Sequence, residues 1–249
     1  MTKIIFTGTS TGFAEKGRFH SQFLLKSSNY NLLFDAGDCT VQALFSAGID
    51  FNEINGIIIS HFHPDHISGL ASLIQQMKLT KRTKSLDIFI NRELKEQLIK
   101  YLALTYIFVD KTEFEIRIKA FDEKRSFNVS SEIKIKAFRN NHINNRHNVD
   151  LQDVKFASNS FFIETESGNI IFTADLNNEN ELFLFPQNNV KFYISELTHI
   201  DFSALEKVLK IFNPEKLIIT HYDLAKKRKI AVDNAKILFA NDGDEFELS

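Results

Sequence analysis

The chain has 249 residues, of which 43% are hydrophobic, 30 are basic and 32 are acidic, and its formal net charge is −2. That length and apolar fraction suffice for one large α/β or sandwich domain, so we expect a single domain over residues 1–249. Nine Gly and three Pro exclude collagen-like and linker-rich proteins. The single cysteine, Cys39, excludes a disulfide scaffold. The low net charge gives no general attraction to a polyanion, so a nucleic-acid contact would need a local basic patch.

The sequence carries no sign of a membrane segment. The N-terminal stretch turns polar after three apolar residues, and no apolar run approaches the ~20 residues that span a bilayer. We therefore expect a cytoplasmic protein. Three short basic clusters, at 81–84, 124–125 and 226–229, are interpreted as solvated loop or helix ends.

Strands predominate among the predicted elements, and helices are inserted between them in both halves of the chain. In chain order we expect strands at 3–8, 21–27 and 30–37, a helix at 39–49, a strand at 56–60, a helix at 66–79, a strand at 87–91, a helix at 92–104, strands at 114–121 and 132–138, a hairpin at 160–175, a strand at 191–196, a helix at 202–212, a strand at 216–221, a helix at 231–239 and an edge strand at 245–249. The spacing is too short for a regular βαβ series. An α/β class with two sheets packed face to face and helices outside fits this pattern.

The most informative segment is HFHPDH at residues 61–66, which follows an apolar strand. It places His61, His63, Asp65 and His66 within six residues. Imidazole and carboxylate groups are ligands that suit Zn²⁺, Fe and Mn²⁺. On a loop leaving a strand, the first two histidines can point the same way while the other two side chains turn toward a neighbouring position. We interpret the segment as a loop serving two adjacent metal ions rather than as a solvated turn.

Three further candidate ligands, His142, Asp175 and His221, lie at the ends of other predicted strands. A lone His or Asp at a strand end is usually structural. Four such strand ends in one chain, counting His61, favour a shared metal site instead.

The segment IISHFHPDHISGL resembles the His-x-His-x-Asp-His signature of the metallo-β-lactamase superfamily. LLFDAGD at 32–38 is similar to that superfamily's first motif, and FRNNH, FTADL and IITH are similar to its third, fourth and fifth. The matching pieces run in the expected order from about residue 3 to residue 222. The resemblance implies an αβ/βα four-layer sandwich, with two mixed β-sheets packed face to face, helices outside, and a dinuclear metal site at one edge.

The resemblance also implies a role for each site residue. His61, His63 and His142 would hold one ion, Asp65, His66 and His221 would hold the other, and Asp175 would bridge them. Asp35 would steady the His61 loop without binding metal. The third-motif ligand has an alternative, because His147 lies close to His142 in the sequence. The expected cofactors are two divalent ions, Zn²⁺ first, with Mn²⁺ or Fe accommodated by the same ligands.

Catalysis is expected to use a water shared by the two ions. Ions ~3.5–4 Å apart lower the pKa of such a water toward 7, so the nucleophile would be a metal-bridging hydroxide held near Asp65 and Asp175 and oriented by Asp65. A general acid contributes ~10²–10⁴-fold, and His199 is the candidate. Its segment, ISELTHIDFSALEKVL, resembles the phosphodiesterase branches of the superfamily, where a histidine contacts the phosphate. Alternatively, His199 helps to cap the helix beginning near Asp201, and Glu196 either orients it or lies at the surface.

The N-terminal segment loosely resembles the same branches. FTGTSTG at 6–12 is similar to their Gly-rich turn, although Gly8 and Gly12 are equally interpreted as ordinary turn glycines. His20 is interpreted as a structural or rim residue rather than a ligand.

The favoured function is a dinuclear metal-dependent hydrolase, a phosphodiesterase acting on a small or cyclic phosphodiester. The alternatives are a ribonuclease Z-like tRNA 3′-processing endonuclease and a lactone or thioester hydrolase of the same fold. Residues 91–131 contain neither Pro nor Gly, so we see no Gly/Pro-rich arm of the kind with which long ribonuclease Z forms grip tRNA. A flavo-di-iron redox protein and a metal-free binding module are disfavoured by the short length and by the intact ligand set. Exposed edge strands and Phe-rich segments indicate a homodimer.

Overall fold

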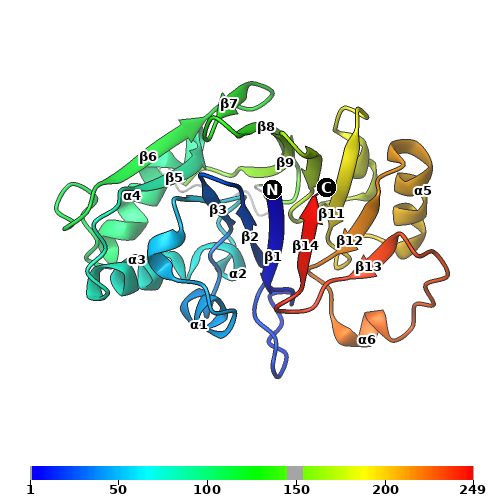
Figure 1. Ribbon diagram of the computed structural model, residues 1–249, viewed down its shortest axis with the longest axis horizontal. Helices are drawn as coiled ribbons and strands as arrows, with labels where there is room; N and C mark the ends of the chain where they lie inside the picture. The colour runs from blue at the N-terminus through cyan, green and yellow to red at the C-terminus, as the bar shows by residue number, and fades with distance from the viewer. Residues whose placement is uncertain (1, 145–153, 249) are drawn as a thin grey trace.

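Two seven-stranded β-sheets pack face to face, and helices cover their outer faces (Figure 1). This computed structural model describes residues 2–144 and 154–248. The strand order is β14-β1-β2-β3-β4-β5-β6 in the first sheet and β13-β12-β11-β10-β9-β8-β7 in the second. The predicted α/β class, an αβ/βα sandwich of two mixed sheets, is confirmed.

The first sheet is built mainly from the N-terminal half of the chain. Its strands are β1 (Thr2–Gly8), β2 (Gln22–Lys26), β3 (Asn31–Phe34), β4 (Gly56–Ile58), β5 (Leu86–Asn91), β6 (Ile116–Phe121) and β14 (Glu245–Leu248). The pairs from β14 to β3 are antiparallel and those from β3 to β6 are parallel. Parallel neighbours need crossover connections, and these contain α1 (Thr40–Ser46), η1 (Phe51–Glu53), α2 (Pro64–Ile67), α3 (Leu70–Leu79), η2 (Arg92–Leu94) and α4 (Lys95–Leu104).

The second sheet repeats this plan with the C-terminal half. Its strands are β7 (Ser126–Asn128), β8 (Ile133–Asn140), β9 (Ser158–Thr165), β10 (Gly168–Phe172), β11 (Val190–Ser195), β12 (Lys216–Ile219) and β13 (Ile237–Phe239). The pairs from β7 to β10 are antiparallel and those from β10 to β13 are parallel. Its connections contain η3 (Glu179–Phe183), α5 (Phe202–Phe212) and α6 (Leu224–Lys227).

Three apolar layers hold the sandwich together. One lies between the first sheet and α1, α3 and α4, and another between the second sheet and α5. The middle layer joins the two sheets and is rich in aromatic rings, with Phe23 stacked on Phe34 at 4.5 Å and edge-on to Phe172 at 5.0 Å between ring centroids. Both sheets therefore bury both faces, which explains why many strands read as continuous apolar runs in the sequence.

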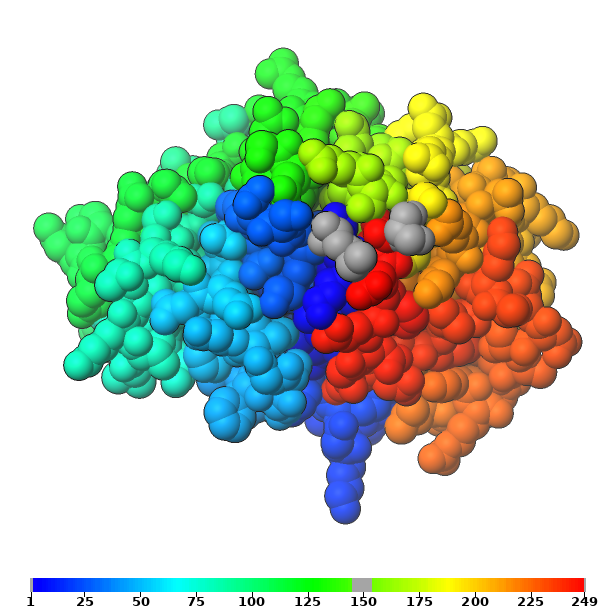
Figure 2. Space-filling view, in the orientation of Figure 1, coloured from blue at the N-terminus to red at the C-terminus, as the bar shows by residue number. Residues whose placement is uncertain are grey.

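The two ends of the chain pair with each other at one edge of the first sheet. β1 pairs with β14 in antiparallel register, Thr2 opposite Leu248, and Figure 2 shows the dark blue N-terminal segment beside the red C-terminal one. The loop after β1 projects from the lower edge in both views. Among the described residues, no helix combines the length and the apolar character needed to cross a bilayer.

The helix predicted at 231–239 is wrong. Residues 231–236 form no helix, and Ile237–Phe239 form β13, which pairs with β12 in parallel. A short apolar run is compatible with either element, and here the free edge of the second sheet offered Ile237 a buried position. The short helix α6, capped by the Asp223 carboxylate at the N–H of Lys226, lies where no helix was predicted.

The solvated interpretation of the basic cluster at 81–84 is wrong for Arg82. Its side chain is buried, and its guanidinium donates hydrogen bonds to the carbonyl oxygens of Phe51, Ile54, Lys84 and Ser85 at 2.7–2.9 Å. An arginine can be buried when its five N–H groups find such acceptors. Here it ties η1 to the turn after α3.

Candidate metal centre

The predicted ligands gather where strands of the two sheets end. His61 and its neighbours follow β4, His142 follows β8, Asp175 follows β10, and His221 follows β12. β8, β10 and β12 run in the same direction, so their carboxyl ends share one edge of the second sheet. This is the edge at which α/β sheets place their ligands.

The seven predicted metal ligands form two groups that share one carboxylate. The first group is His61, His63, His142 and Asp175, and the second is Asp65, His66, Asp175 and His221. In each group the candidate ligand atoms lie within 4.8 Å of one another. Asp175 places Oδ2 3.5 Å from His142 Nε2 and Oδ1 3.4 Å from His221 Nδ1. Its two oxygens thus face the two groups, the position expected of a bridging ligand.

Three non-glycine residues around the site have positive φ angles, a backbone conformation that such residues rarely adopt. Asp35, Ala174 and His221 have φ angles of 61°, 48° and 45°. Each such residue costs about 1–3 kcal/mol and persists only where surrounding contacts hold it. At His221 such a contact is present, because Thr198 Oγ1 donates to the carbonyl oxygen of His221 at 2.7 Å. Strain of this kind is typical of functional sites.

Asp35 steadies the loop that contains His61 through the hydroxyl of Ser60, a residue that was not among the predicted site residues. Asp35 Oδ1 accepts from the N–H of Ser60, and Oδ2 accepts from Ser60 Oγ and lies 2.8 Å from His66 Nδ1. Ser60 Oγ is also 2.9 Å from His61 Nδ1. Asp35 therefore orients one imidazole of each group, His66 directly and His61 through Ser60. Such outer partners set the tautomer and ring orientation of a ligating histidine.

Burial and charge prepare these groups to bind a cation. Burial lowers the pKa of His61 and His63, and it lowers the pKa of His142 to about 4. These imidazoles are neutral at pH 7, which is the form that binds metal. Burial would raise the pKa of Asp65 and Asp175, but His221 and His66 hold both pKa values well below the usual range. The carboxylates are therefore ionised.

Three buried atoms at the centre lack the partner that a cation would supply. His61 Nε2, His66 Nε2 and Asp175 Oδ1 have no hydrogen-bond partner among the described residues. The 3.5 Å between the last two atoms is too long for a good hydrogen bond. Leaving such atoms unsatisfied costs about 1–3 kcal/mol each. Imidazoles and carboxylates are the donor set of Zn²⁺, Mn²⁺ and Fe sites, so the residues fit divalent metal ions.

His199 lies beside both groups and is held by Glu196. Its ring is 4.7 Å from that of His142, and its Nδ1 is 3.3 Å from Glu196 Oε1. Glu196 is buried, and its Oε2 accepts from the N–H of His199 at 2.9 Å. Burial would lower the pKa of His199, but the Glu196 carboxylate raises it above its ordinary value. Because the N-cap of α5 is Asp201, the alternative capping role for His199 finds no support in this geometry.

The remaining sequence candidates take structural places or lie outside the described residues. His147 falls in 145–153, which the structure does not describe. His20 Nδ1 lies 2.6 Å from the carbonyl oxygen of Thr11, in keeping with a structural role. Gly8 packs against the carbonyl of His20, and Gly12 lies against the carboxylate of Asp65. Gly8 is therefore needed for close approach of the backbone, whereas the neighbour of Gly12 is a side chain, which can move.

Replacing Gly37 with Ala should damage fold and site together. A Cβ at Gly37 would lie 1.9 Å from the backbone oxygen of Asp65, and backbone cannot yield as a side chain can. We expect a loss of about 3 kcal/mol, seen as a fall in Tm of roughly 6–12 °C, together with reduced metal content. Gly12→Ala is the comparison, since its Cβ would meet the Asp65 side chain at 3.0 Å. It should leave Tm within about 2 °C of wild type. An unchanged Tm in Gly37→Ala would contradict the packing argument.

A cavity of about 700 Å³ opens beside the first group. His63, His142 and His199 form one side of it, and Phe62, Gln97 and Phe156 belong to the rest of its lining. Cavities of ~300–1,000 Å³ with mostly apolar walls and a few polar groups are typical small-molecule sites. The histidines and the cavity together make a site where a small polar ligand can reach the proposed metal ligands.

Comparison with known proteins agrees with the fold described above. Ribonuclease Z of Methanococcus aeolicus is 32% identical over 136 residues, which are 55% of this chain and 41% of that protein, so the match spans less than half of the relative's length. The structure of YhfI from Bacillus subtilis, a metallo-β-lactamase fold protein, matches with a TM-score of 0.75 at 21% identity and 98% coverage of both chains. Human tRNase Z, short form, matches with a TM-score of 0.74 at 17% identity and 99% coverage of both chains. These two likenesses show a shared fold.

Fold and motifs together define a hydrolase of the metallo-β-lactamase superfamily, as the sequence motifs predicted. Within that superfamily, the family model described as anti-Pycsar protein Apyc1 matches residues 2–246. The chain therefore belongs to the anti-Pycsar protein Apyc1 family.

Proposed function

We propose that the chain is a single-domain, cytoplasmic phosphodiesterase that holds two divalent metal ions, Zn²⁺ in the first place, and cleaves a small or cyclic phosphodiester. The observation that carries this proposal is the pair of ligand groups sharing Asp175, with His199 fixed at their side. The cavity of about 700 Å³ beside them suits a ligand of nucleotide size.

The candidate ligands would divide between the two metal ions. His61, His63 and His142 would hold one ion, Asp65, His66 and His221 the other, and Asp175 both. When bound, such a pair of ions supplies charge stabilisation for the attacking and leaving oxygens and a nucleophile at neutral pH. Asp65 Oδ2 lies 3.3 Å from His221 Nε2 and 3.5 Å from His66 Nε2. Its carboxylate would therefore orient a water bound beside these two imidazoles.

His199 is the group that would protonate the leaving oxygen. Glu196 engages Nδ1, which leaves Nε2 free to carry a proton toward the cavity that His199 lines. A phosphodiester needs such a proton because its leaving alkoxide is a strong base. This pairing of His199 and Glu196 favours phosphodiesters over thioesters, because a thiolate leaves without needing a proton.

The test is a panel assay after metal quantitation. Purified protein is given an activated phosphodiester, a cyclic nucleotide, a lactone, a thioester and precursor tRNA, with metal per chain measured on the same preparation. We expect turnover of the activated phosphodiester and the cyclic nucleotide, and close to two ions per chain. Turnover of the lactone alone would overturn the phosphodiesterase proposal, and less than one ion per chain would overturn the dinuclear one.

A tRNA substrate is the second candidate, and its support is the sequence match to ribonuclease Z. The described part of residues 91–131 forms η2, α4, β6 and β7, whose exposed charges are mixed in sign. A mixed surface gives little of the phosphate attraction that dominates RNA binding. Cleavage of precursor tRNA at its 3′ side, with no activity on the cyclic nucleotide, would favour this candidate.

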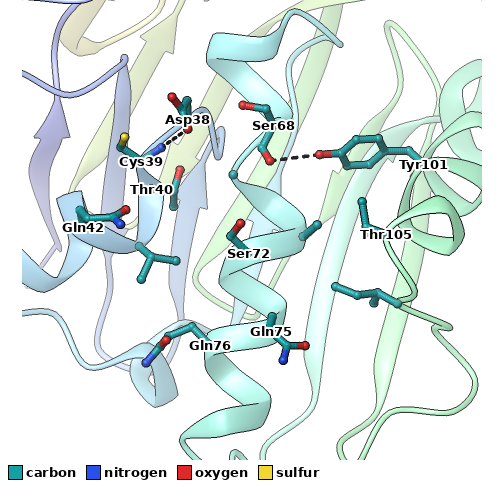
Figure 3. A pocket seen from close by; sticks show the side chains of 14 residues that line it. Asp38, Cys39, Thr40, Gln42, Ser68, Ser72, Gln75, Gln76, Tyr101 and Thr105 are labelled. Atoms are coloured by element: carbon teal, nitrogen blue, oxygen red, sulfur yellow. Dashed lines mark hydrogen bonds between the residues drawn. The ribbon is translucent and has the colours of Figure 1, made fainter.

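We also propose that two copies of the chain associate through the outer faces of α1, α3 and the end of α4. A cavity of about 560 Å³ lies between these helices, and of its lining residues only Asp38 carries a charge. Figure 3 shows Gln42 of α1, Ser72 and Gln75 of α3, and Thr105 after α4 around it. Residues 39–49 and 67–77 contain no charged side chain, although 25% of the chain is charged.

Large apolar side chains are exposed on the same helices. Phe45 of α1 is 77% exposed and Leu104 at the end of α4 is 82% exposed, and Leu79 at the end of α3 and Tyr106 just after α4 are also exposed. Depletion of charge together with exposed aromatic residues is typical of an interface core. In the two-fold contact of a homodimer the same face of each copy packs against the other. A face without charge can do so without repulsion between like charges. The edge strand β6 is a poorer candidate, because Arg117 and Lys119 point from it and edge charges oppose strand pairing.

Substitution of Phe45 by Glu should shift the chain from dimer to monomer. A charge placed on each copy would be repeated across the two-fold contact and would be desolvated there, at a cost of several kcal/mol. Mass is measured by light scattering during gel filtration over a range of concentrations. Phe13→Glu is the matched control, since Phe13 is 74% exposed on the loop after β1, and it should remain dimeric. A monomeric wild-type protein at all concentrations would refute the association.

A further inference from the structure

Glu181 is a buried carboxylate that joins two loops of the metal centre. It lies in η3 and is almost fully buried. Its Oε1 accepts from the backbone N–H of Asn141 at 2.7 Å and from Asn141 Nδ2 at 2.8 Å. Its Oε2 accepts from the backbone N–H of Asn177 at 2.7 Å. One side chain therefore binds both the loop after β8 and the loop after β10.

Both loops carry candidate metal ligands next to the residues that Glu181 contacts. Asn141 directly precedes His142, and Asn177 is two residues beyond Asp175. The loops also touch each other through the intervening residue, because His142 Nδ1 lies 3.2 Å from the carbonyl oxygen of Leu176. That contact uses Nδ1 and leaves His142 Nε2 facing Asp175 Oδ2 at 3.5 Å. The relative position of the two loops thus decides whether His142 Nε2 and Asp175 Oδ2 can reach the same metal ion.

A carboxylate is well suited to this task, and its burial indicates that it is retained for a purpose. A buried charge is expensive unless hydrogen bonds compensate it, and here three N–H groups do so. Hydrogen bonds to an ionised acceptor are roughly twice as strong as neutral ones. Because the two oxygens accept from different loops, the spacing of the loops is set by the width of one carboxylate.

We propose that Glu181 is a positioning residue, which holds the His142 loop at the distance from the Asp175 loop that the first metal ion requires. The inference rests on the proposed metal centre, but it concerns the affinity of one ion and not the reaction. Outer partners of ligating residues typically change metal affinity 10–100-fold. Asp175 belongs to both groups, but the loss should be greatest in the group that contains His142, since His66 and His221 of the other group are held separately by Asp35 and Thr198.

The test compares two substitutions of Glu181 with a control from the same turn. Glu181→Gln keeps the length but replaces one acceptor oxygen by a donor, so it cannot satisfy both loops. Glu181→Asp keeps the charge and both acceptors but is one methylene too short to reach both. Glu179→Gln is the matched control, because Glu179 is only half-buried in η3 and its contact is Lys207 at 4.0 Å. Metal-free proteins are titrated with Co²⁺ against a chelator, the visible absorption of bound Co²⁺ is recorded, and the metal-free Tm is measured.

We expect two bound Co²⁺ in wild type and in Glu179→Gln. In Glu181→Gln and Glu181→Asp, one ion should bind ~10–100-fold more weakly with an altered absorption spectrum, while the affinity of the other falls much less. Wild-type affinity and spectrum in folded Glu181→Gln protein would overturn the inference. Wild-type affinity in Glu181→Asp would overturn it too, because charge rather than position would then be the cause.

The failure of the metal centre itself is distinguishable. If wild-type protein binds no Co²⁺, both the proposed centre and the role of Glu181 are refuted, whereas normal binding in both Glu181 variants refutes only the latter. If Glu181→Gln does not fold, Asn141→Ala removes one of the three hydrogen bonds and should weaken one ion about 5-fold, as the loss of about 1 kcal/mol implies. Unchanged affinity in Asn141→Ala would then overturn the inference.

Discussion

Replacing Asp175 with Asn is expected to lower phosphodiester turnover by about three orders of magnitude and to remove at least one ion per chain. Asp175 is buried and belongs to both ligand groups, so the change takes one negative charge from both at once. Metal ions contribute several kcal/mol of transition-state stabilisation, and each 1.36 kcal/mol corresponds to a factor of ten in rate. The measurements are metal per chain by elemental analysis and kcat/KM on an activated phosphodiester.

The matched control for this substitution is Asp110→Asn. Asp110 is an exposed carboxylate in the turn after α4, so the same chemical change there should alter neither quantity. Full metal content and full activity in Asp175→Asn would exclude a bridging role. Full metal content with lost activity would instead assign Asp175 to catalysis.

Replacing His199 with Ala is expected to lower turnover of a phosphodiester with an ordinary alkoxide leaving group by ~10²-fold or more, while the metal content stays unchanged. The reason is the loss of a proton donor that Glu196 holds beside the cavity. A substrate with a very acidic leaving group, such as a nitrophenol, should lose far less activity, because it departs without protonation.

The comparison of the two substrates separates the roles open to His199. Glu196, His199 and His221 also place candidate ligand atoms within 4.8 Å of one another. Loss of metal from His199→Ala would therefore assign it to an ion. An equal loss of activity on both substrates, with metal retained, would point to substrate binding rather than to proton donation.

Most of the secondary structure could be predicted because its signals are local. The strand at 132–138 alternates charged and apolar residues, and β8 presents Ile133, Ile135 and Ala137 inward as that alternation requires. The helix at 202–212 shows the same agreement, with Ala204, Leu205 and Val208 buried in α5. The helix expected at 66–79 is interrupted at Gly69, whose Cβ would lie 2.0 Å from the carbonyl oxygen of Gly37. A single glycine is only a weak local signal for a break, and the contact that requires it lies on a segment 32 residues away.

The predictions made for Arg82 and Ile237 are wrong for a related reason. A charged residue in a basic cluster reads as solvated, and a short apolar run reads equally as helix or strand. Their places were decided by the carbonyl groups around the end of η1 and by the open edge of β12. Neither partner is adjacent in the sequence.

The amino-acid sequence alone determined the chemistry of the candidate site. HFHPDH, together with a His or Asp at the ends of three other strands, specifies the kind of ligand and its place on a strand end, because both follow from side-chain type and local periodicity. The tertiary structure alone decided what holds those ligands. Ser60 lies 25 residues from Asp35, and Glu181 lies 40 residues from Asn141, and each pair meets only because the loops lie together at the edge of the sandwich. A hydrogen bond between distant loops is set by sheet order and register, which no local pattern contains.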